Sequence, residues 1–145
     1  MIQDDIFDSI VSLLNSNKLD IRRETVTTVS NMITTLESSR LNDLVFDKYP
    51  NLMHDYLRNL TFTTNKRIIF PILDSLEYLF GLDEQYGLQD EHSFSHLIET
   101  NNGFDLLEKL MQGANDQIYT RAEYVINTYI EGDRQEAFAD NDDYM

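Results

Sequence analysis

The chain has 145 residues, of which 41% are apolar and 26% charged; this is typical of one globular domain or a short array of repeats and unlike disordered, collagen-like or membrane proteins. Its 26 acidic and 11 basic residues give a net charge of −15, which argues against nucleic acid and anionic membranes as partners, because both would repel the chain. The absence of cysteine excludes disulfide bonds, cysteine-bound zinc and thiol catalysis.

The N-terminal segment predicts a first helix rather than a targeting signal. Residues 1–10, MIQDDIFDSI, lack the cationic flank of a signal peptide. No apolar stretch in the sequence approaches the roughly 20 residues needed to cross a bilayer, so we expect an intracellular protein. Apolar residues at helical spacing mark two consecutive helices, at Ile10, Leu13 and Leu14, and then at Ile21, Val29 and Ile33.

The same register of apolar positions recurs twice along the chain, after 47 and after a further 50 residues. The second copy comprises Leu57, Leu60, Thr61, Ile68, Leu76 and Phe80, and the third comprises Leu107, Leu110, Met111, Ile118, Ile126 and Ile130; the single lapse from apolar character is Thr61. Shorter apolar runs in residues 39–49 and 93–100 predict one more helix before each of these copies. Prolines and glycines such as Pro71 and Gly81 stand mostly where an apolar pattern stops, as expected at helix ends.

Each complete unit is therefore predicted to contain a short, a medium and a long helix, which gives eight main helices in the chain. Repeats of roughly 40–50 residues with two or three helices are typical of armadillo and HEAT proteins. We expect an all-α, armadillo-repeat right-handed solenoid of about 2.7 repeats. The predicted domain covers residues 1–132, with units at about 2–37, 39–82 and 90–131, and a disordered acidic tail follows at 133–145.

Several segments of the chain resemble the importin-α family of nuclear import adaptors, over nearly all of residues 2–132. Residues 22–31, RRETVTTVSN, are similar to the long helix of an importin-α armadillo repeat, and residues 72–80, ILDSLEYLF, are similar to the penultimate repeat. The most specific similarity is to the final repeat, in LIE at 97–99, GFDLLEKL at 103–110 and NDQIY at 115–119. The resemblance implies that the chain corresponds to the last three armadillo repeats, the first of them incomplete.

The resemblance also implies a peptide-binding groove, which this sequence alters. In the family, the long helices carry a Trp and, four residues later, an Asn, which hold the side chains and backbone of a nuclear localisation signal. The Trp positions here are Thr27, Asp74 and Tyr124, and the Asn positions are Asn31, Tyr78 and Thr128. Because the chain has no Trp at all, we expect a simple basic signal to bind weakly.

The inward face of the long helices is nevertheless the first candidate site. Its predicted binding residues are Asn31, Asp74, Glu77, Tyr78 and Tyr124. Carboxylates would pair with Lys or Arg of a basic peptide, tyrosine rings would cover their aliphatic stems, and Asn31 would bond backbone amides. The lack of Lys and Arg between Arg67 and Lys109 would focus negative potential there. The alternative is that this mixed polar surface is only a solvated face.

The acidic C-terminal tail is the second candidate surface. Its predicted partner-binding residues are Glu131, Asp133, Glu136, Phe138, Asp140, Asp142, Asp143 and Tyr144. Phe138 and Tyr144 would act as aromatic anchors when the segment orders on a partner. The acidic run at 140–143 lacks the central Gly and the closing Glu of an EF-hand, so no calcium site is expected.

Metal binding and catalysis have little support in the sequence. On one helix, His92, His96 and Glu99 would share a side with a spacing that can bind zinc, but a solvated helix is the simpler interpretation. Nothing nearby supplies a second organised group for catalysis. We therefore expect no enzyme activity, no cofactor and no metal, and a small metal-dependent enzyme is the least favoured alternative.

The functional expectation is a protein-binding module of a nuclear transport adaptor, similar to the C-terminal end of importin-α. Its partners would be an export receptor, cargo or other basic peptide segments, in cytoplasm and nucleus. The alternative is an armadillo scaffold or chaperone-like protein that binds a basic partner outside nuclear transport. We also expect self-association through the N-terminal end, where residues such as Phe7 and Ile10 can be covered on one side only.

Overall fold

The computed structural model describes residues 4–61, 65–113 and 115–130, with side chains from residue 7 onward. All regular structure in these ranges is helical. The α-helices are α1 (Asp4–Leu13), α2 (Leu19–Thr35), α3 (Ser38–Asn42), α4 (Leu52–Leu57), α5 (Lys66–Tyr86), α6 (Phe94–Thr100), α7 (Gly103–Leu110) and α8 (Asp116–Val125). Shorter 3₁₀ or π turns adjoin them at η1 (Asp43–Lys48), η2 (Arg58–Leu60), η3 (Asp90–His92) and η4 (Ile126–Ile130). The all-α prediction is confirmed for the described residues.

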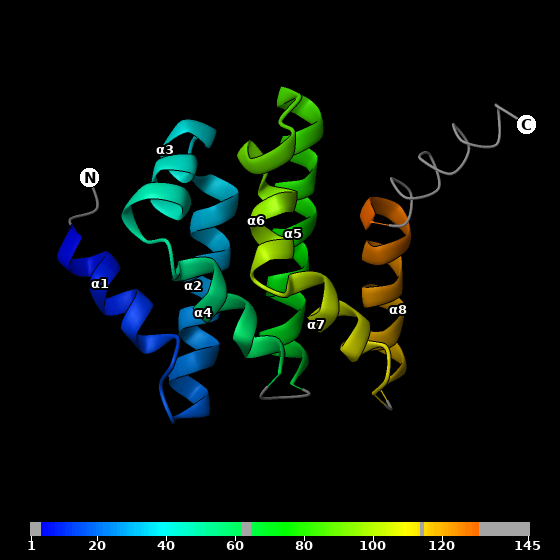
Figure 1. The fold of residues 1–145 in the computed structure, drawn as a ribbon. Coiled ribbons are helices and arrows are strands. Elements are labelled where there is room, and N and C mark those ends of the chain that lie inside the picture. The colour runs from blue at the N-terminus through cyan, green and yellow to red at the C-terminus, as the bar shows by residue number, and fades with distance from the viewer. Residues whose placement is uncertain (1–3, 62–64, 114, 131–145) are drawn as a thin grey trace, which may run out of the picture.

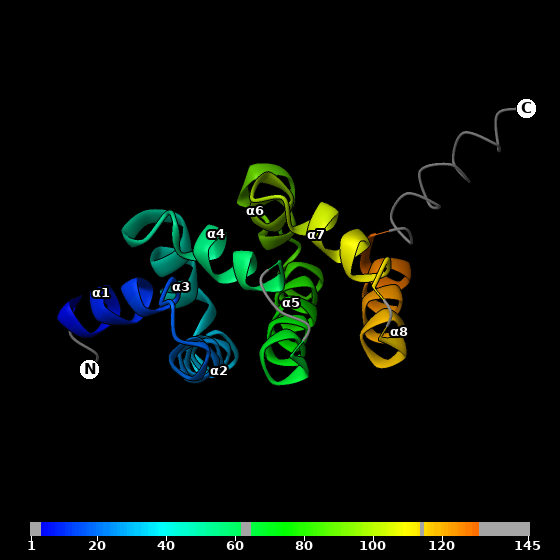
Figure 2. The same cartoon turned by 90° about the horizontal axis from the view of Figure 1, so that it is seen from below.

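The helices form three layers that repeat along the molecule (Figures 1 and 2). Helices α2, α5 and α8 lie side by side in chain order, with α2 packed on α5 and α5 packed on α8. A middle layer lies against these three helices. In it, α1 packs on α2, the turn η2, which follows α4, packs on α5, and α7 packs on α8. Figure 2 shows α6 on the side away from α2, α5 and α8, and α3 near the level of α1. One face of the molecule is therefore built from α2, α5 and α8, and we call it the long-helix face.

The three helices of the long-helix face begin at equivalent places in the sequence. Their N-cap residues are Lys18, Asn65 and Asn115, which are 47 and 50 residues apart, as the apolar register predicts. The Asn65 side chain accepts a hydrogen bond from the backbone N of Arg67 at 2.9 Å, and Asn115 accepts one from Ile118 at 3.0 Å. Asn is a preferred N-cap because its side-chain oxygen satisfies backbone N–H groups that have no partner within the helix.

Helix α5 continues through two residues that the sequence pattern predicts at helix ends. Pro71 and Gly81 both lie inside it, and the helix ends only before Gly87, whose φ of 62° is a left-handed conformation that suits glycine. Pro71 removes one backbone hydrogen bond, but burial of Ile72, Leu73, Leu76 and Leu79 on the same helix outweighs that loss. The hydroxyl of Ser30 donates to the Pro71 carbonyl at 3.0 Å and links α2 to α5. The helix thus extends beyond residue 82, the predicted end of the second unit.

The hydrophobic core runs through all three layers and follows the predicted register closely. Register positions at most 7% exposed are Leu14, Val29, Ile33, Leu57, Leu60, Ile68, Leu76, Phe80, Leu107, Ile118, Ile126 and Ile130. Four further register positions are half-buried and one is exposed: Ile10, Ile21, Leu110 and Met111, and Thr61. Leu13 is also an exception, because 42% of it is exposed. It ends α1, which among the described residues packs mainly on α2 and therefore buries less of its surface than helices with neighbours on both sides.

Two buried polar contacts join the layers. The hydroxyl groups of Tyr56 on α4 and Ser75 on α5 lie 2.8 Å apart, and burial raises the pKa of Tyr56 well above its usual value. Asn59 in η2 is only 1% exposed. Its side-chain oxygen accepts a hydrogen bond from Nε of Arg22 at 2.9 Å, and its amide nitrogen donates to the Leu14 carbonyl at 3.4 Å. Asn59 therefore connects the end of α1, the first turn of α2 and η2.

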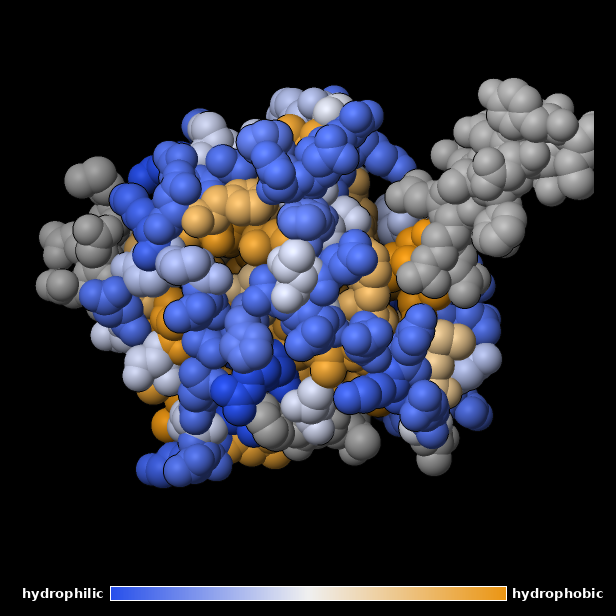
Figure 3. Space-filling model, viewed as in Figure 1, coloured by the Kyte–Doolittle hydropathy of each residue, from blue (hydrophilic) through white to orange (hydrophobic). Residues whose placement is uncertain are grey.

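The face opposite the long-helix face carries α3, α4, α6 and α7 and is mostly hydrophilic, with hydrophobic residues visible between the elements (Figure 3). In the described ranges, the apolar side chains of these helices point inward and belong to the common core cluster. No helix in the part of the chain that the structure describes is both long enough and apolar enough to span a bilayer.

Candidate functional site

The predicted groove residues all occupy positions on the three helices of the long-helix face. Asn31 is exposed on α2, Asp74 and Tyr78 are exposed on α5, and Glu77 on the same helix is half-buried. Tyr124 on α8 is 54% exposed. The structure brings Asp74 and Glu77 together at one point, whereas the other three side chains are spread over three helices.

A cation from the same chain lies at the two carboxylates. The guanidinium of Arg121 on α8 donates a hydrogen bond to Asp74 and lies 3.6 Å from a carboxylate oxygen of Glu77. It also lies over the ring of Phe70, 5.3 Å from the ring centroid. Because residues 70, 74 and 77 are spaced by four and three along α5, they share one side of the helix. We call this group, Phe70, Asp74, Glu77 and Arg121, the Arg121 cluster.

The electrostatics of the Arg121 cluster are set by one cation between two acids. Burial raises the pKa of Glu77, and the negative charge of Asp74 raises it further, while Arg121 opposes the rise. The side chains of Arg121, Asp74 and Glu77 are 33%, 59% and 24% exposed. The cluster is therefore partly accessible to solvent and keeps a net negative charge when both carboxylates are ionised.

Sequence reasoning missed Arg121. The sequence predicts that Asp74 and Glu77 bind a Lys or Arg of a partner, but in this structure their neighbouring cation belongs to the chain itself. The stretch without basic residues ends at Lys109, so the negative potential it predicts on α5 is partly neutralised by α8. The sequence did contain one indication that Arg121 belongs to this face. Arg121 precedes Tyr124 by three residues, which places both on one side of α8.

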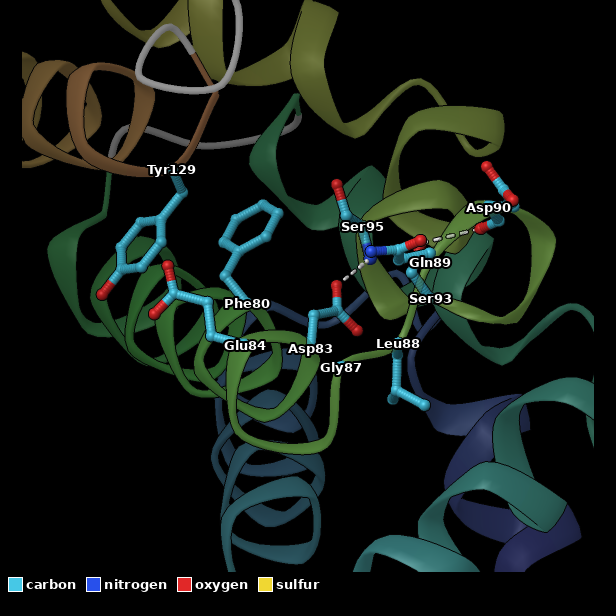
Figure 4. Close-up of a pocket in the computed structure, with 10 residues that line it drawn as sticks. All are labelled: Phe80, Asp83, Glu84, Gly87, Leu88, Gln89, Asp90, Ser93, Ser95 and Tyr129. Carbon is cyan, nitrogen blue, oxygen red and sulfur yellow. Dashed lines mark hydrogen bonds between the residues drawn. The ribbon is translucent and has the colours of Figure 1, made fainter. Parts of the chain in front are cut away.

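A pocket lies at the C-terminal end of α5, beyond the Arg121 cluster on the same helix (Figure 4). It has a volume of about 520 Å³ and is lined by Phe80, Asp83, Glu84, Gly87, Leu88, Gln89, Asp90, Ser93, Ser95 and Tyr129. The rings of Phe80 and Tyr129 stack at 5.2 Å between centroids with 14° between their planes. Burial raises the pKa of Tyr129, and the charge of Glu77 adds to the rise. Tyr129 is therefore close enough to Glu77 for the charge of that carboxylate to affect it.

Asp83 in this pocket holds the start of α6 in place. Its carboxylate oxygens accept hydrogen bonds from the backbone N atoms of Phe94 and Ser95, each at 2.8 Å. The Ser93 hydroxyl caps the same helix by accepting from the backbone N of His96 at 3.0 Å. Two side chains from different elements thus satisfy the first N–H groups of α6.

Replacing Asp83 by Asn should destabilise the protein and change its pH dependence. The amide side chain would offer one acceptor oxygen instead of two, so we expect the free energy of unfolding to fall by about 1–2 kcal/mol at neutral pH. Burial raises the pKa of Asp83, against the effect of its two backbone hydrogen bonds. The native state therefore keeps this proton to a higher pH than the unfolded state, whose carboxyl titrates near 3.8. The stability that Asp83 contributes is therefore largest below the pKa of its carboxyl in the unfolded state. It falls as pH rises through the pKa of the same carboxyl in the folded state.

The deficit of Asp83→Asn should accordingly be larger in acid than at neutral pH, as measured by urea unfolding followed by circular dichroism. Glu84→Gln is the matched control, because Glu84 lines the same pocket but is exposed, and it should change stability by less than about 0.5 kcal/mol. A deficit that grows as pH rises would show that folding lowers the pKa of Asp83.

The histidines do not form the arrangement that a zinc site on one helix would need. His92 ends the turn η3, whereas His96 lies in α6, and Ser93 begins a new helix between them. Within the described ranges, no group of three or more His, Cys, Asp or Glu side chains is placed to hold a metal ion. The predicted tail residues, from Glu131 to Tyr144, lie outside the residues that the structure describes.

The comparisons with known proteins include a distant similarity. No family model matches the chain. The chain is similar to importin subunit alpha-5 from Arabidopsis thaliana, with 26% identity over 125 residues. The similarity covers 86% of this chain and 23% of that protein, so the chain spans about a quarter of the length of the relative it matches.

Proposed function

We propose that the chain is a protein-binding module built from armadillo repeats, and that its long-helix face binds extended, basic segments of other proteins. The observation that carries this proposal is the row of α2, α5 and α8, which exposes polar, acidic and aromatic side chains on one face. The similarity to importin subunit alpha-5 supports it. We propose binding rather than catalysis as the activity of this face.

The repeat assignment has two supports. The N-caps of α2, α5 and α8 recur at intervals of 47 and 50 residues, and each of these helices packs against the next in the chain. In the proposed right-handed solenoid of about 2.7 repeats, α1 and α2 complete the first unit, α3 to α5 form the second and α6 to α8 form the third. Such arrays present extended surfaces that suit extended peptides.

The chemistry of the face favours a weakly bound basic peptide. Asp74 and Glu77 supply two carboxylates, and the exposed rings of Tyr78 and Tyr124 can cover the aliphatic stems of Lys or Arg. Asn31 can bond a peptide backbone. An exposed ion pair contributes only about 0.2–1 kcal/mol, so we expect the dissociation constant to be micromolar or weaker.

In the cell, we propose that this module belongs to a nuclear transport adaptor that moves between cytoplasm and nucleus and docks an export receptor or cargo. The name of the similar protein, importin subunit alpha-5, is the basis for this finer assignment. Capture of an export receptor together with its GTP-bound small GTPase would support it. A stable complex with one basic protein outside transport would instead support the scaffold or chaperone-like alternative.

The groove proposal is tested by titrating the full chain into a labelled ten-residue peptide in which Lys or Arg alternates with Ala, with fluorescence anisotropy as the readout. Asp74→Asn should weaken binding by about fivefold, which corresponds to about 1 kcal/mol, and raised salt should weaken the wild type further. Asp105→Asn removes the same charge from an exposed position on α7 and should change affinity by less than about twofold. Equal losses in both variants would mean that the peptide responds to net charge and not to the long-helix face.

A further inference from the structure

We infer that Arg121 is a built-in competitor for the Asp74 and Glu77 site: it occupies the position that a partner's Lys or Arg would take and has to leave before that cation can bind. This inference depends on the proposed function, because it concerns the regulation of the same face. It also makes Arg121 a residue that sets how strongly, and for which partners, the face binds.

The geometry of the Arg121 cluster is that of an occupied cation site. The guanidinium lies within reach of two carboxylates, those of Asp74 and Glu77, and over the aromatic ring of Phe70. Carboxylates and an aromatic face are the groups by which proteins hold a basic side chain. The chain therefore satisfies with its own residue the site that the proposed function assigns to a ligand.

Arg121 can leave this position without unfolding α8. The side chain is 33% exposed and its main partner Asp74 is 59% exposed, and ion pairs with this much solvent around them are weak. An open surface hollow of about 430 Å³ adjoins the cluster and is lined by Phe70, Asp116, Gln117, Thr120 and Arg121, which gives the guanidinium room to turn away.

Helix α8 has other attachments that remain when Arg121 turns away. Lys66 at the start of α5 donates a hydrogen bond to the side chain of Gln117 in the first turn of α8. The buried side chains of Ile118, Ala122 and Val125 lie on the inner side of the same helix. Displacement of Arg121 is therefore a side-chain movement on a helix that stays in place.

The competing explanation is that Arg121 is only a clamp between α5 and α8. A clamp and a competitor differ in one measurable respect, the affinity of the face for a basic ligand. Removal of a clamp lowers stability and leaves the affinity unchanged or weaker. Removal of a competitor frees both carboxylates and strengthens binding, because the apparent dissociation constant depends on the fraction of molecules whose site is open.

The test uses the full chain and the ten-residue alternating peptide described above. We expect Arg121→Gln to bind the peptide about fivefold more tightly than the wild type, the factor by which a weak internal pair closes the site. Arg40→Gln is the matched control, since it makes the same substitution and charge change at an exposed position on α3. It should strengthen binding by less than about twofold, through net charge alone.

A second background separates local competition from general charge. In the variant Asp74→Asn with Glu77→Gln, there are no carboxylates for Arg121 to occupy, so adding Arg121→Gln should no longer improve affinity more than Arg40→Gln does. Far-ultraviolet circular dichroism and thermal unfolding check that each variant is folded. If Arg121→Gln does not fold, Arg121→Met takes its place with Arg40→Met as control, because Met keeps an unbranched apolar stem over Phe70.

The outcomes distinguish this inference from the function on which it depends. Tighter binding by Arg121→Gln than by Arg40→Gln, lost in the carboxylate-free background, supports it. If the wild type binds the peptide and loses affinity in Asp74→Asn, but Arg121→Gln only matches Arg40→Gln, the competitor role is overturned and the groove proposal stands. If neither the wild type nor Arg121→Gln binds, the groove proposal fails, and the competitor role fails with it.

Discussion

Placing Asp at position 76 should lower the free energy of unfolding by about 5 kcal/mol, the largest single effect that we expect in this protein. Leu76 is fully buried in the middle of α5, where the long helix contributes to the core shared by all three layers. A carboxylate there would have to remain charged without a partner or take up a proton, and the packing of the leucine would be lost in either case. Since domains of this size are stable by only about 5–15 kcal/mol, this loss removes from about a third to all of the stability, and the midpoint of urea unfolding should fall accordingly.

Urea unfolding followed by circular dichroism measures this loss. Leu76→Met is the matched control, because it nearly conserves volume and should cost less than about 1.5 kcal/mol. If Leu76→Asp unfolds with the midpoint and slope of the wild type, Leu76 does not belong to the core, and the register that relates Val29, Leu76 and Ile126 is wrong.

Replacing Asn59 by Leu should cost about 3 kcal/mol, although leucine is a similar size and more apolar. The Asn59 side chain accepts from Nε of Arg22 at 2.9 Å and donates to the carbonyls of Leu14, Asp55 and Tyr56 at 3.4, 3.0 and 3.3 Å. Leucine would remove the acceptor that faces a half-buried guanidinium, and the loss of a hydrogen bond to a charged group is costly in such a place.

Thermal and urea unfolding of Asn59→Leu should be compared with Asn101→Leu. Asn101 is half-buried, and its amide donates to a carbonyl four residues earlier, that of Leu97, at 2.8 Å, so its loss should cost about 1 kcal/mol. Adding Arg22→Met to Asn59→Leu should cost less than the sum of the two single changes, because they remove one shared contact. Equal stability of the two leucine variants would show that Asn59 is not a structural connection between α1, α2 and η2.

The core could be predicted from the sequence because the spacing of apolar residues along the chain specifies which side of each helix is buried. Ile68, Leu76 and Phe80 recur at helical spacing, and burial of one side of each helix requires that spacing wherever the helix packs. A different rule, that proline and glycine mark helix ends, fails at Pro71 and Gly81, which lie inside α5. There, burial of neighbouring apolar residues outweighs the local preference of proline and glycine to interrupt helices.

The polar contacts between units could not be predicted in this way. Arg121 and Asp74 are 47 residues apart, and their contact depends on how closely α8 packs beside α5, which no local pattern specifies. Asn59 begins the sequence Asn-Leu-Thr, an acceptor pattern for glycosylation that on its own would indicate an exposed loop. Its burial follows from the position of η2 between α1 and α5, a property of the assembled layers.

The link from Asp83 to the start of α6 makes the stability of one helix end depend on the other. The acceptor carboxylate belongs to the end of α5, and the N–H groups that it binds follow 11 and 12 residues later. Fraying of the last turn of α5 would therefore release two backbone N–H groups of α6, so local opening at this junction should involve both helices together.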